Sequence, residues 1–132
     1  MTVPNPVGAA VDDATAGAPR LRMEPAAFLA LDRACADVID RLTEARTAAE
    51  SLAAHSPWGL GEDNPRLWTA SALVRIFREK AAEGPNNAAT TLDAYRTTAE
   101  QLRTLLTTAR DHLLRTDAEF ARAFRELDQT SA

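Results

Sequence analysis

Two long stretches of this chain contain neither glycine nor proline, and in both of them apolar residues recur at alternating spacings of three and four. The first stretch follows Pro25 and runs to about Ala54, and the second covers residues 88–127. This spacing keeps one apolar row on one side of an α-helix over many turns, which is typical of long packed helices. We call this row the predicted seam. Its positions in the first stretch are Phe28, Leu31, Cys35, Val38, Leu42, Ala45, Ala49 and Leu52. Its positions in the second stretch are Leu92, Tyr95, Ala99, Leu102, Leu106, Ala109, Leu113, Thr116, Phe120, Ala123 and Leu127.

The segment between the two stretches is divided by glycine and proline. Pro57, Gly59 and Gly61 end the first helix, and the Gly-Pro-Asn-Asn sequence at 84–87 forms a second interruption. Between them, residues 65–82 have the spacing of a shorter helix that carries apolar residues on two faces. The residues on its second face are Trp68, Leu73 and Ile76. The pattern predicts an all-α fold, an antiparallel helical hairpin of two long helices with a shorter helix between them.

We expect one folded domain with short extensions. Residues 1–22 hold proline and glycine without any apolar period, so they are expected to form a flexible N-terminal arm. The helical-hairpin domain is expected to cover residues 23–128, and residues 129–132 form a C-terminal tail.

Apolar residues also lie beside the predicted seam, and they have two explanations. Either the helix over 65–82 covers them, or a second chain does. Because one hairpin buries little apolar area against the entropy of ordering its residues, a homodimer or a helical partner is favoured. The residues concerned are Ile39, Leu105, Leu114 and Phe124.

Composition excludes several classes of function. The net charge of −4 argues against nucleic-acid binding, which needs clustered positive charge. No apolar run approaches the roughly 20 residues that span a bilayer, and no secretory signal peptide is visible. Cys35 occupies a core position, and His55 and His112 are too isolated to form a zinc site. We find no catalytic, cofactor-binding or metal-binding residues, so the protein is predicted not to be an enzyme.

Three arginines recur every seven residues in the second stretch, at Arg96, Arg103 and Arg110. They form a basic stripe along one side of the helix. This stripe either docks an acidic partner or is a solvated charged face, which nearby acids neutralise at helical spacing. The second interpretation is favoured, and the acids are Asp93, Glu100 and Asp111.

The turn after the first helix carries Trp58 and Gly59. Tryptophan at a helix–helix turn offers a large amphipathic surface, and glycine lets another backbone approach closely. Trp58 therefore either presents a recognition surface or closes the end of the hairpin by packing. Physical chemistry alone ranks the packing role first.

A long helix, a Trp-Gly turn and a second long helix together resemble the WXG/ESX family of small helical-hairpin proteins. The stretch Leu21-Arg22-Met23-Glu24-Pro25 is similar to the opening of EspC-like proteins associated with type VII secretion in actinobacteria. The turn from Pro57 to Glu62 is similar to their inter-helix loop, although Gly59 follows Trp58 directly where the family has Trp-x-Gly. The resemblance covers about residues 21–128.

The resemblance implies a non-enzymatic substrate or accessory factor of a type VII system, acting through helix-mediated protein–protein recognition. The implied partners are a second helical chain and a secretion component. The family export signal has tyrosine four residues before an acid, and the nearest match here is Phe124 with Asp128. The candidate recognition residues are therefore Trp58, Gly59, Phe124 and Asp128. The expected location is the cytoplasm, or outside the cell by type VII export without a cleaved signal peptide.

Two alternatives come from other functional classes. The chain could be a cytoplasmic structural or regulatory helical interaction module that is not exported. It could also be a scaffold subunit of an enzyme, for which the sequence gives no positive sign. Comparing culture filtrate with cytosol separates the first alternative from the secretion hypothesis.

Overall fold

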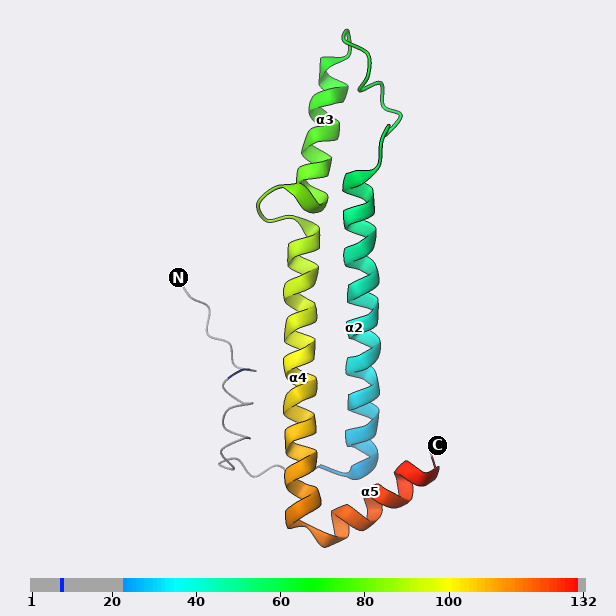
Figure 1. Ribbon diagram of the computed structural model, residues 1–132, viewed down its shortest axis with the longest axis vertical. Coiled ribbons are helices and arrows are strands. Elements are labelled where there is room, and N and C mark those ends of the chain that lie inside the picture. The colour runs from blue at the N-terminus through cyan, green and yellow to red at the C-terminus, as the bar shows by residue number, and fades with distance from the viewer. Residues whose placement is uncertain (1–7, 9–22, 131–132) are drawn as a thin grey trace. The chain divides into compact units, whose positions relative to one another are not determined.

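The computed structural model describes Gly8 and residues 23–130, and all regular secondary structure within residues 23–130 is helical. In chain order the elements are α2 (Pro25–Ala54), α3 (Trp68–Arg78), the π-helical turn η1 (Glu79–Glu83), α4 (Ala88–Thr116) and α5 (Ala118–Thr130). Figure 1 shows α2 and α4 side by side and antiparallel. The predicted all-α hairpin, with a shorter helix between two long ones, is confirmed.

Some predicted segments fall outside the part of the chain that the structure describes. The predicted flexible arm, residues 1–22, lies outside it except for Gly8, and so does the Leu21-Arg22 part of the family-like opening. Of the predicted C-terminal tail, Gln129 and Thr130 belong to helix α5, and residues 131–132 lie outside the described residues.

The middle helix begins later than predicted because Asn64 forms a turn first. The Asn64 side-chain Oδ1 accepts the backbone N–H of Arg66 at 3.0 Å, and its carbonyl accepts that of Leu67 at 2.9 Å. Helix α3 therefore starts at Trp68. After Arg78 the backbone widens into η1, which is closed by a hydrogen bond from Gly84 N–H to the Glu79 carbonyl at 2.8 Å.

Asn87 starts helix α4 by capping it. Its Oδ1 accepts the N–H of Thr90 at 2.8 Å, and its Nδ2 donates to the Gly84 carbonyl at 2.6 Å. The side chain is buried, so both of these bonds satisfy polar groups that are removed from water. The turn predicted at 84–87 is thus a helix start as well as an interruption.

The prediction of one unbroken helix over residues 88–127 is wrong, because the chain breaks at Asp117. The Asp117 side chain accepts the N–H of Phe120 at 3.0 Å, and its carbonyl accepts that of Ala121 at 3.0 Å. Aspartate is a strong N-cap residue because its carboxylate satisfies an N–H group that lacks a partner in the first helical turn. A new helix, α5, therefore starts without any glycine or proline.

Contacts divide the chain into two compact units, which we describe separately. Unit 1 contains the described residues up to Ile39 together with those from Thr97 onward, and unit 2 is Asp40–Arg96. The core of unit 1 is a cluster of buried side chains from α2, α4 and α5. Its members are Phe28, Cys35, Leu106, Phe120 and Phe124.

Aromatic contacts hold α5 to the start of α2 in unit 1. The rings of Phe28 and Phe124 meet edge to face with centroids 6.0 Å apart, and Phe120 lies 6.0 Å from Phe124. The guanidinium of Arg110 lies 5.8 Å from the Phe28 ring centre. Leu114 packs against the same cluster. Helix α5 therefore covers Leu114 and brings Phe124 into the core. The sequence had predicted that the middle helix or a second chain would cover these residues.

The predicted seam is partly wrong. In unit 1, Phe28, Cys35 and Leu106 are buried, but Leu31, Val38 and Leu102 are 44%, 45% and 40% exposed. We call these last three residues the exposed flank. Each of them lies three residues after a buried position, 28, 35 or 99. In an antiparallel helix pair, side chains three residues after the contact positions point to the same side of the pair from both helices. In unit 2, the predicted seam positions Leu52 and Tyr95 are also exposed, three residues after the half-buried Ala49 and Leu92.

The line along which α2 and α4 contact each other instead includes residues four positions after the buried ones. Two of these residues, Asp32 and Arg103, are charged. In unit 1, Asp32 of α2 pairs with Arg103 of α4, Oδ1 to Nε, at 2.9 Å. Arginine can lie across a helix interface because its methylene groups cover apolar surface while the guanidinium stays near water. The basic stripe therefore faces α2 at Arg103, where a solvated outer face was predicted.

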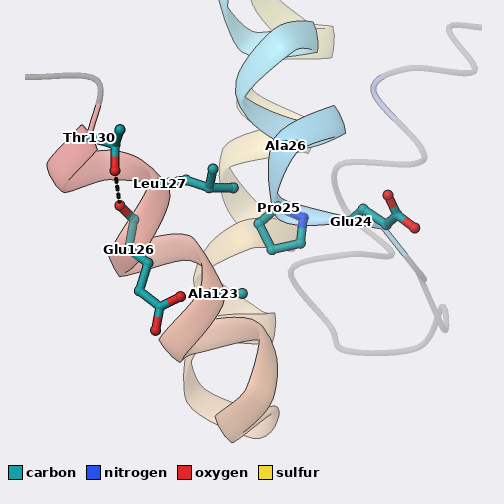
Figure 2. Close-up of a pocket in the computed structure, with 7 residues that line it drawn as sticks. All are labelled: Glu24, Pro25, Ala26, Ala123, Glu126, Leu127 and Thr130. Atoms are coloured by element: carbon teal, nitrogen blue, oxygen red, sulfur yellow. Dashed lines mark hydrogen bonds between the residues drawn. The ribbon is translucent and has the colours of Figure 1, made fainter.

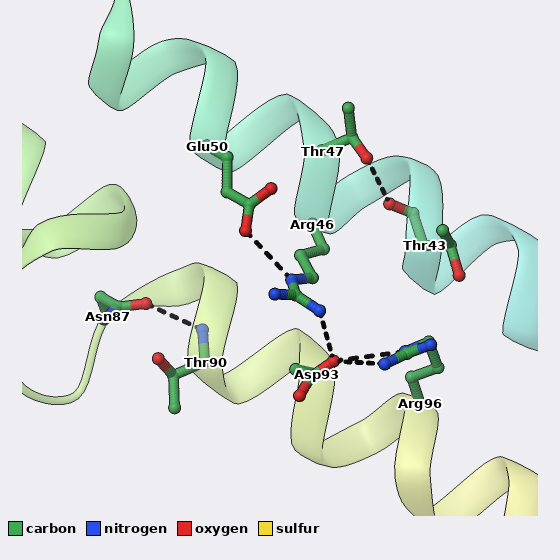
Figure 3. A network of polar contacts seen from close by, with 8 residues as sticks. All are labelled: Thr43, Arg46, Thr47, Glu50, Asn87, Thr90, Asp93 and Arg96. Carbon is green, nitrogen blue, oxygen red and sulfur yellow. Dashed lines mark hydrogen bonds and ion pairs between the residues drawn. The ribbon is translucent and has the colours of Figure 1, made fainter.

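In unit 2 the equivalent position holds a polar network centred on Asp93 (Figure 3). Its Oδ1 accepts from Arg46 of α2 at 2.8 Å and from Arg96 of α4 at 2.7 Å. Arg46 also pairs with Glu50 one turn along α2, at 3.1 Å. The hydrogen bond from Arg96, followed by attraction to Arg46, holds the pKa of Asp93 below its usual value. The local pairing predicted between Arg96 and Asp93 is confirmed.

Candidate recognition site

Trp58 packs inside unit 2. Its ring stacks on Phe77 of α3, with centroids 5.7 Å apart and an interplanar angle of 13°. The indole Nε1 is buried and has no hydrogen-bond partner within the described part of the chain. These contacts favour the packing role for Trp58, because the stacked ring face and the N–H are turned away from solvent.

The carboxylate of Glu62 organises the turn around Trp58. Its Oε1 accepts the backbone N–H groups of Trp58 and Gly59, the latter at 3.2 Å, and its Oε2 accepts that of Leu60 at 2.9 Å. Hydrogen bonds from its own backbone N–H and from those of Trp58, Leu60 and Gly59 hold the pKa of Glu62 below its usual value. Sequence analysis did not identify Glu62 as the residue that fixes this turn.

Gly59 is required for backbone conformation. Its φ of +80° lies in the left-handed region that side-chain-bearing residues rarely adopt. No heavy atom lies within 4 Å of the place where a Cβ would stand, so no close approach requires a glycine there. Gly59 is therefore needed for the left-handed backbone of the turn, and its Cβ position faces open space among the described residues.

The other predicted pair lies on α5 in unit 1. Phe124 is only 9% exposed and belongs to the aromatic core, whereas Asp128, one turn later, is exposed. The structure thus places Trp58 beside Gly59 in one unit and Phe124 near Asp128 in the other. Phe124 holds α5 in place, and Asp128 is the member of its pair that a partner can reach.

A shallow open pocket lies where α5 ends against the start of α2, within unit 1 (Figure 2). Leu127 and Pro25 supply apolar groups, and Glu24 and Glu126 supply carboxylates. The Thr130 hydroxyl donates to the Glu126 carbonyl at 2.8 Å within the last turn of α5. None of the described residues that line this pocket is cationic, and together they form a small acidic and apolar surface.

The most exposed aromatic side chain of the described chain is Trp68, which was predicted only as part of a second apolar face. Trp68 is 74% exposed, and Leu73 and Ile76 on the same helix are also exposed. We call these three residues the α3 outer face. The signal for it was present in the sequence, since apolar residues on two sides of residues 65–82 exceed what one packing contact needs.

The structure shows no grouping of side chains that could hold a metal ion in the part of the chain it describes. No group of three or more histidine, cysteine or acidic side chains converges among these residues. Cys35 is buried in the core of unit 1. No helix within residues 23–130 has the length and hydropathy to cross a membrane.

Comparison with protein-family models, with curated proteins and with solved structures finds no match for this chain.

Proposed function

We propose that this protein acts by helix-mediated recognition, as a non-enzymatic substrate or accessory factor of a type VII secretion system. The observation that supports recognition is the exposed flank. Leu31, Val38 and Leu102 recur at the spacing of a helix interface, yet the chain's own helices leave all three exposed. Exposed apolar rows of this kind commonly mark protein–protein contacts. The link to type VII secretion comes from the sequence resemblance alone.

The proposed occupant of the exposed flank is a second helical chain, either another copy or a different helical protein. In unit 1 the flank contains residues from both α2 and α4, so a partner helix can contact the two helices together. Sedimentation velocity of the full chain is the direct test. We expect a dimer, or a monomer that forms a complex with a co-encoded helical protein.

The matched variants replace Leu31 and Val38 by Ser, and, as a control, exposed Leu52 by Ser in unit 2. The first pair should abolish association while the circular dichroism spectrum stays helical, because these side chains lie outside the core. If the wild-type protein is a monomer and forms no complex with any co-encoded helical protein, the proposal is contradicted. Equal loss of association in the control would place the interface elsewhere.

The secretion role is tested in the native host by comparing culture filtrate with cytosol. We propose that a secretion component contacts the Trp58 turn and, independently, Asp128 at the end of α5. A negative charge at a helix C-terminus opposes the helix dipole, so Asp128 gives no stability benefit there. Asp128→Ala should reduce export at unchanged cellular level, with thermal melts to check folding. Because Trp58 stacks on Phe77, Trp58→Ala tests contact with the turn only if its thermal melt matches that of the wild type.

The alternative function is a cytoplasmic helical interaction module that is not exported. The same exposed flank supports it, because partner binding does not depend on location. If the wild-type protein stays in the cytosol of a strain with an active type VII system, the secretion role fails and this alternative replaces it.

A further inference from the structure

The α3 outer face is a second apolar surface, in unit 2, and it is distinct from the exposed flank of unit 1. Trp68, Leu73 and Ile76 lie within less than half a turn of the helix circumference, since each residue advances the helix by about 100°. Together they cover about 12 Å of helix length, or roughly two turns. That is the dimension of a contact with one partner helix.

The α3 outer face is not the side on which α3 packs within unit 2. Val74 is buried, and Phe77 stacks on Trp58. These two residues lie on the side of the helix that faces the rest of the unit. The outer face therefore turns away from the unit's own packing, and its exposure is not a consequence of a short helix with a single apolar side.

Three cationic residues lie near this face in the sequence, Arg75 within α3, Arg66 two residues before Trp68 and Lys80 four residues after Ile76. Arg66, Arg75 and Lys80 are exposed, and none of their charged groups forms a hydrogen bond or ion pair with a described residue. Other arginines of unit 2 are engaged, as Arg46 is with Asp93 and Arg78 is with the His55 carbonyl at 2.8 Å.

The charge of this segment is opposite to that of the whole chain. Residues 66–80 carry four cationic residues and one acidic residue, Glu79, whereas the chain carries a net charge of −4. Positive charge concentrated around an exposed apolar row attracts a partner of complementary charge. The total charge acts equally on any anionic partner, so a helix is preferred to a membrane surface because of the two-turn length of the apolar row.

We propose that the α3 outer face binds an acidic amphipathic helix of a partner protein. The partner's apolar row packs against Trp68, Leu73 and Ile76, and its carboxylates pair with Arg75, Lys80 and Arg66. This is recognition of a helix by its apolar anchors, with charge setting the choice of partner. The proposal concerns unit 2 and does not depend on what occupies the exposed flank of unit 1.

The test uses a display library of amphipathic helical peptides about 20 residues long, which is enough for a stable two-turn contact. Their apolar positions are fixed as leucine, and the positions beside them carry glutamate and lysine in equal proportion. Peptides selected for binding to the full-length protein should be enriched in glutamate. Selected on the Arg75→Glu, Lys80→Glu double variant, they should be enriched in lysine, a reversal that misfolding cannot produce.

Affinity is then measured in solution with the best acidic peptide. Leu73→Ser with Ile76→Ser should weaken binding by about tenfold or more, because two apolar anchors are lost. Leu31→Ser with Val38→Ser, in unit 1, should leave this affinity unchanged, which separates the inference from the proposed function. Added salt should weaken the binding of the acidic peptide, because salt screens the attraction between exposed charges.

Three results overturn the inference. The first is selection with no glutamate bias, or with a bias that charge reversal leaves unchanged. The second is binding to vesicles of anionic phospholipid that requires Leu73 and Ile76 while no peptide is selected, which assigns the face to a membrane surface. The third is self-association that disappears in the Leu73→Ser, Ile76→Ser variant, which assigns the face to a second copy of the chain.

Discussion

Arg103 of α4 donates from Nε to Oδ1 of Asp32 on α2 at 2.9 Å, one residue beyond the predicted seam positions Leu102 and Leu31. The ion pair is partly exposed to solvent, and the two apolar residues beside it are left outside the contact between the helices. This helix pair therefore joins through a mixed apolar and charged line and keeps apolar residues on its outside.

Two leucines one helical turn apart should respond differently to truncation. Leu106 is buried in the core of unit 1, so Leu106→Ala should lower the free energy of unfolding by about 2–5 kcal/mol. Leu102 is exposed, and Leu102→Ala should lower it by less than about 1 kcal/mol. Urea denaturation of both variants is the measurement. Equal effects would show that the exposed flank is covered in solution.

The Asp32–Arg103 pair should contribute little to stability. Arg103→Ala should cost less than about 1 kcal/mol, and a double-mutant cycle with Asp32→Ala should give a coupling free energy of about 0.2–1 kcal/mol. The coupling should fall as salt is added, because both side chains reach solvent. A coupling that is larger and insensitive to salt would mean that the pair is desolvated.

Removing the cap at Asp117 should loosen α5. Asp117→Ala leaves the Phe120 N–H without its side-chain acceptor, so we expect a loss of about 0.5–2 kcal/mol in the free energy of unfolding. Asp128→Ala is the matched control, since this aspartate lies at the other end of the same helix and is exposed. Thermal melts of the two variants should differ in the stated direction, and identical melts would contradict the capping role.

The turn around Trp58 should weaken in acid. Because the folded-state pKa of Glu62 lies below its usual value near 4.5, its contribution is fully present above that value and is lost as pH falls through the folded-state pKa. Tryptophan fluorescence followed from neutral to acidic pH should report this transition. Glu62→Gln should remove it, whereas Asp63→Asn, at the next residue, should not.

Helix positions could be predicted from the sequence where strong breakers mark them. The predicted bounds of the first helix, Pro25 to Ala54, agree with α2, because proline begins it and Pro57 with two glycines ends it. The break at Asp117 was missed because it depends on a single capping carboxylate and no breaker residue. The sequence alone could not show whether Asp117 would cap a new helix or stay within a longer one.

The packing register was harder to predict than the helices. A three-four repeat identifies an apolar side, but that side is wide enough to contact two neighbours. Asp32 and Arg103 are charged, so the apolar pattern did not include them, yet they lie on the contact line. Among the candidate recognition residues, too, local features could be predicted from the sequence and packing could not. Gly59 was located by its turn, while the core position of Phe124 depends on the direction that α5 takes after Asp117.

The contact between Phe28 and Phe124 joins residues from nearly opposite ends of the chain. During synthesis on the ribosome, α2 is made before α5, and the Phe124 ring that contacts Phe28 is added 96 residues after it. The core of unit 1 therefore cannot close until α5 has been synthesised, and until then Phe28 is not covered by this helix. A nascent chain of this protein consequently exposes the Phe28 ring to chaperones before unit 1 folds.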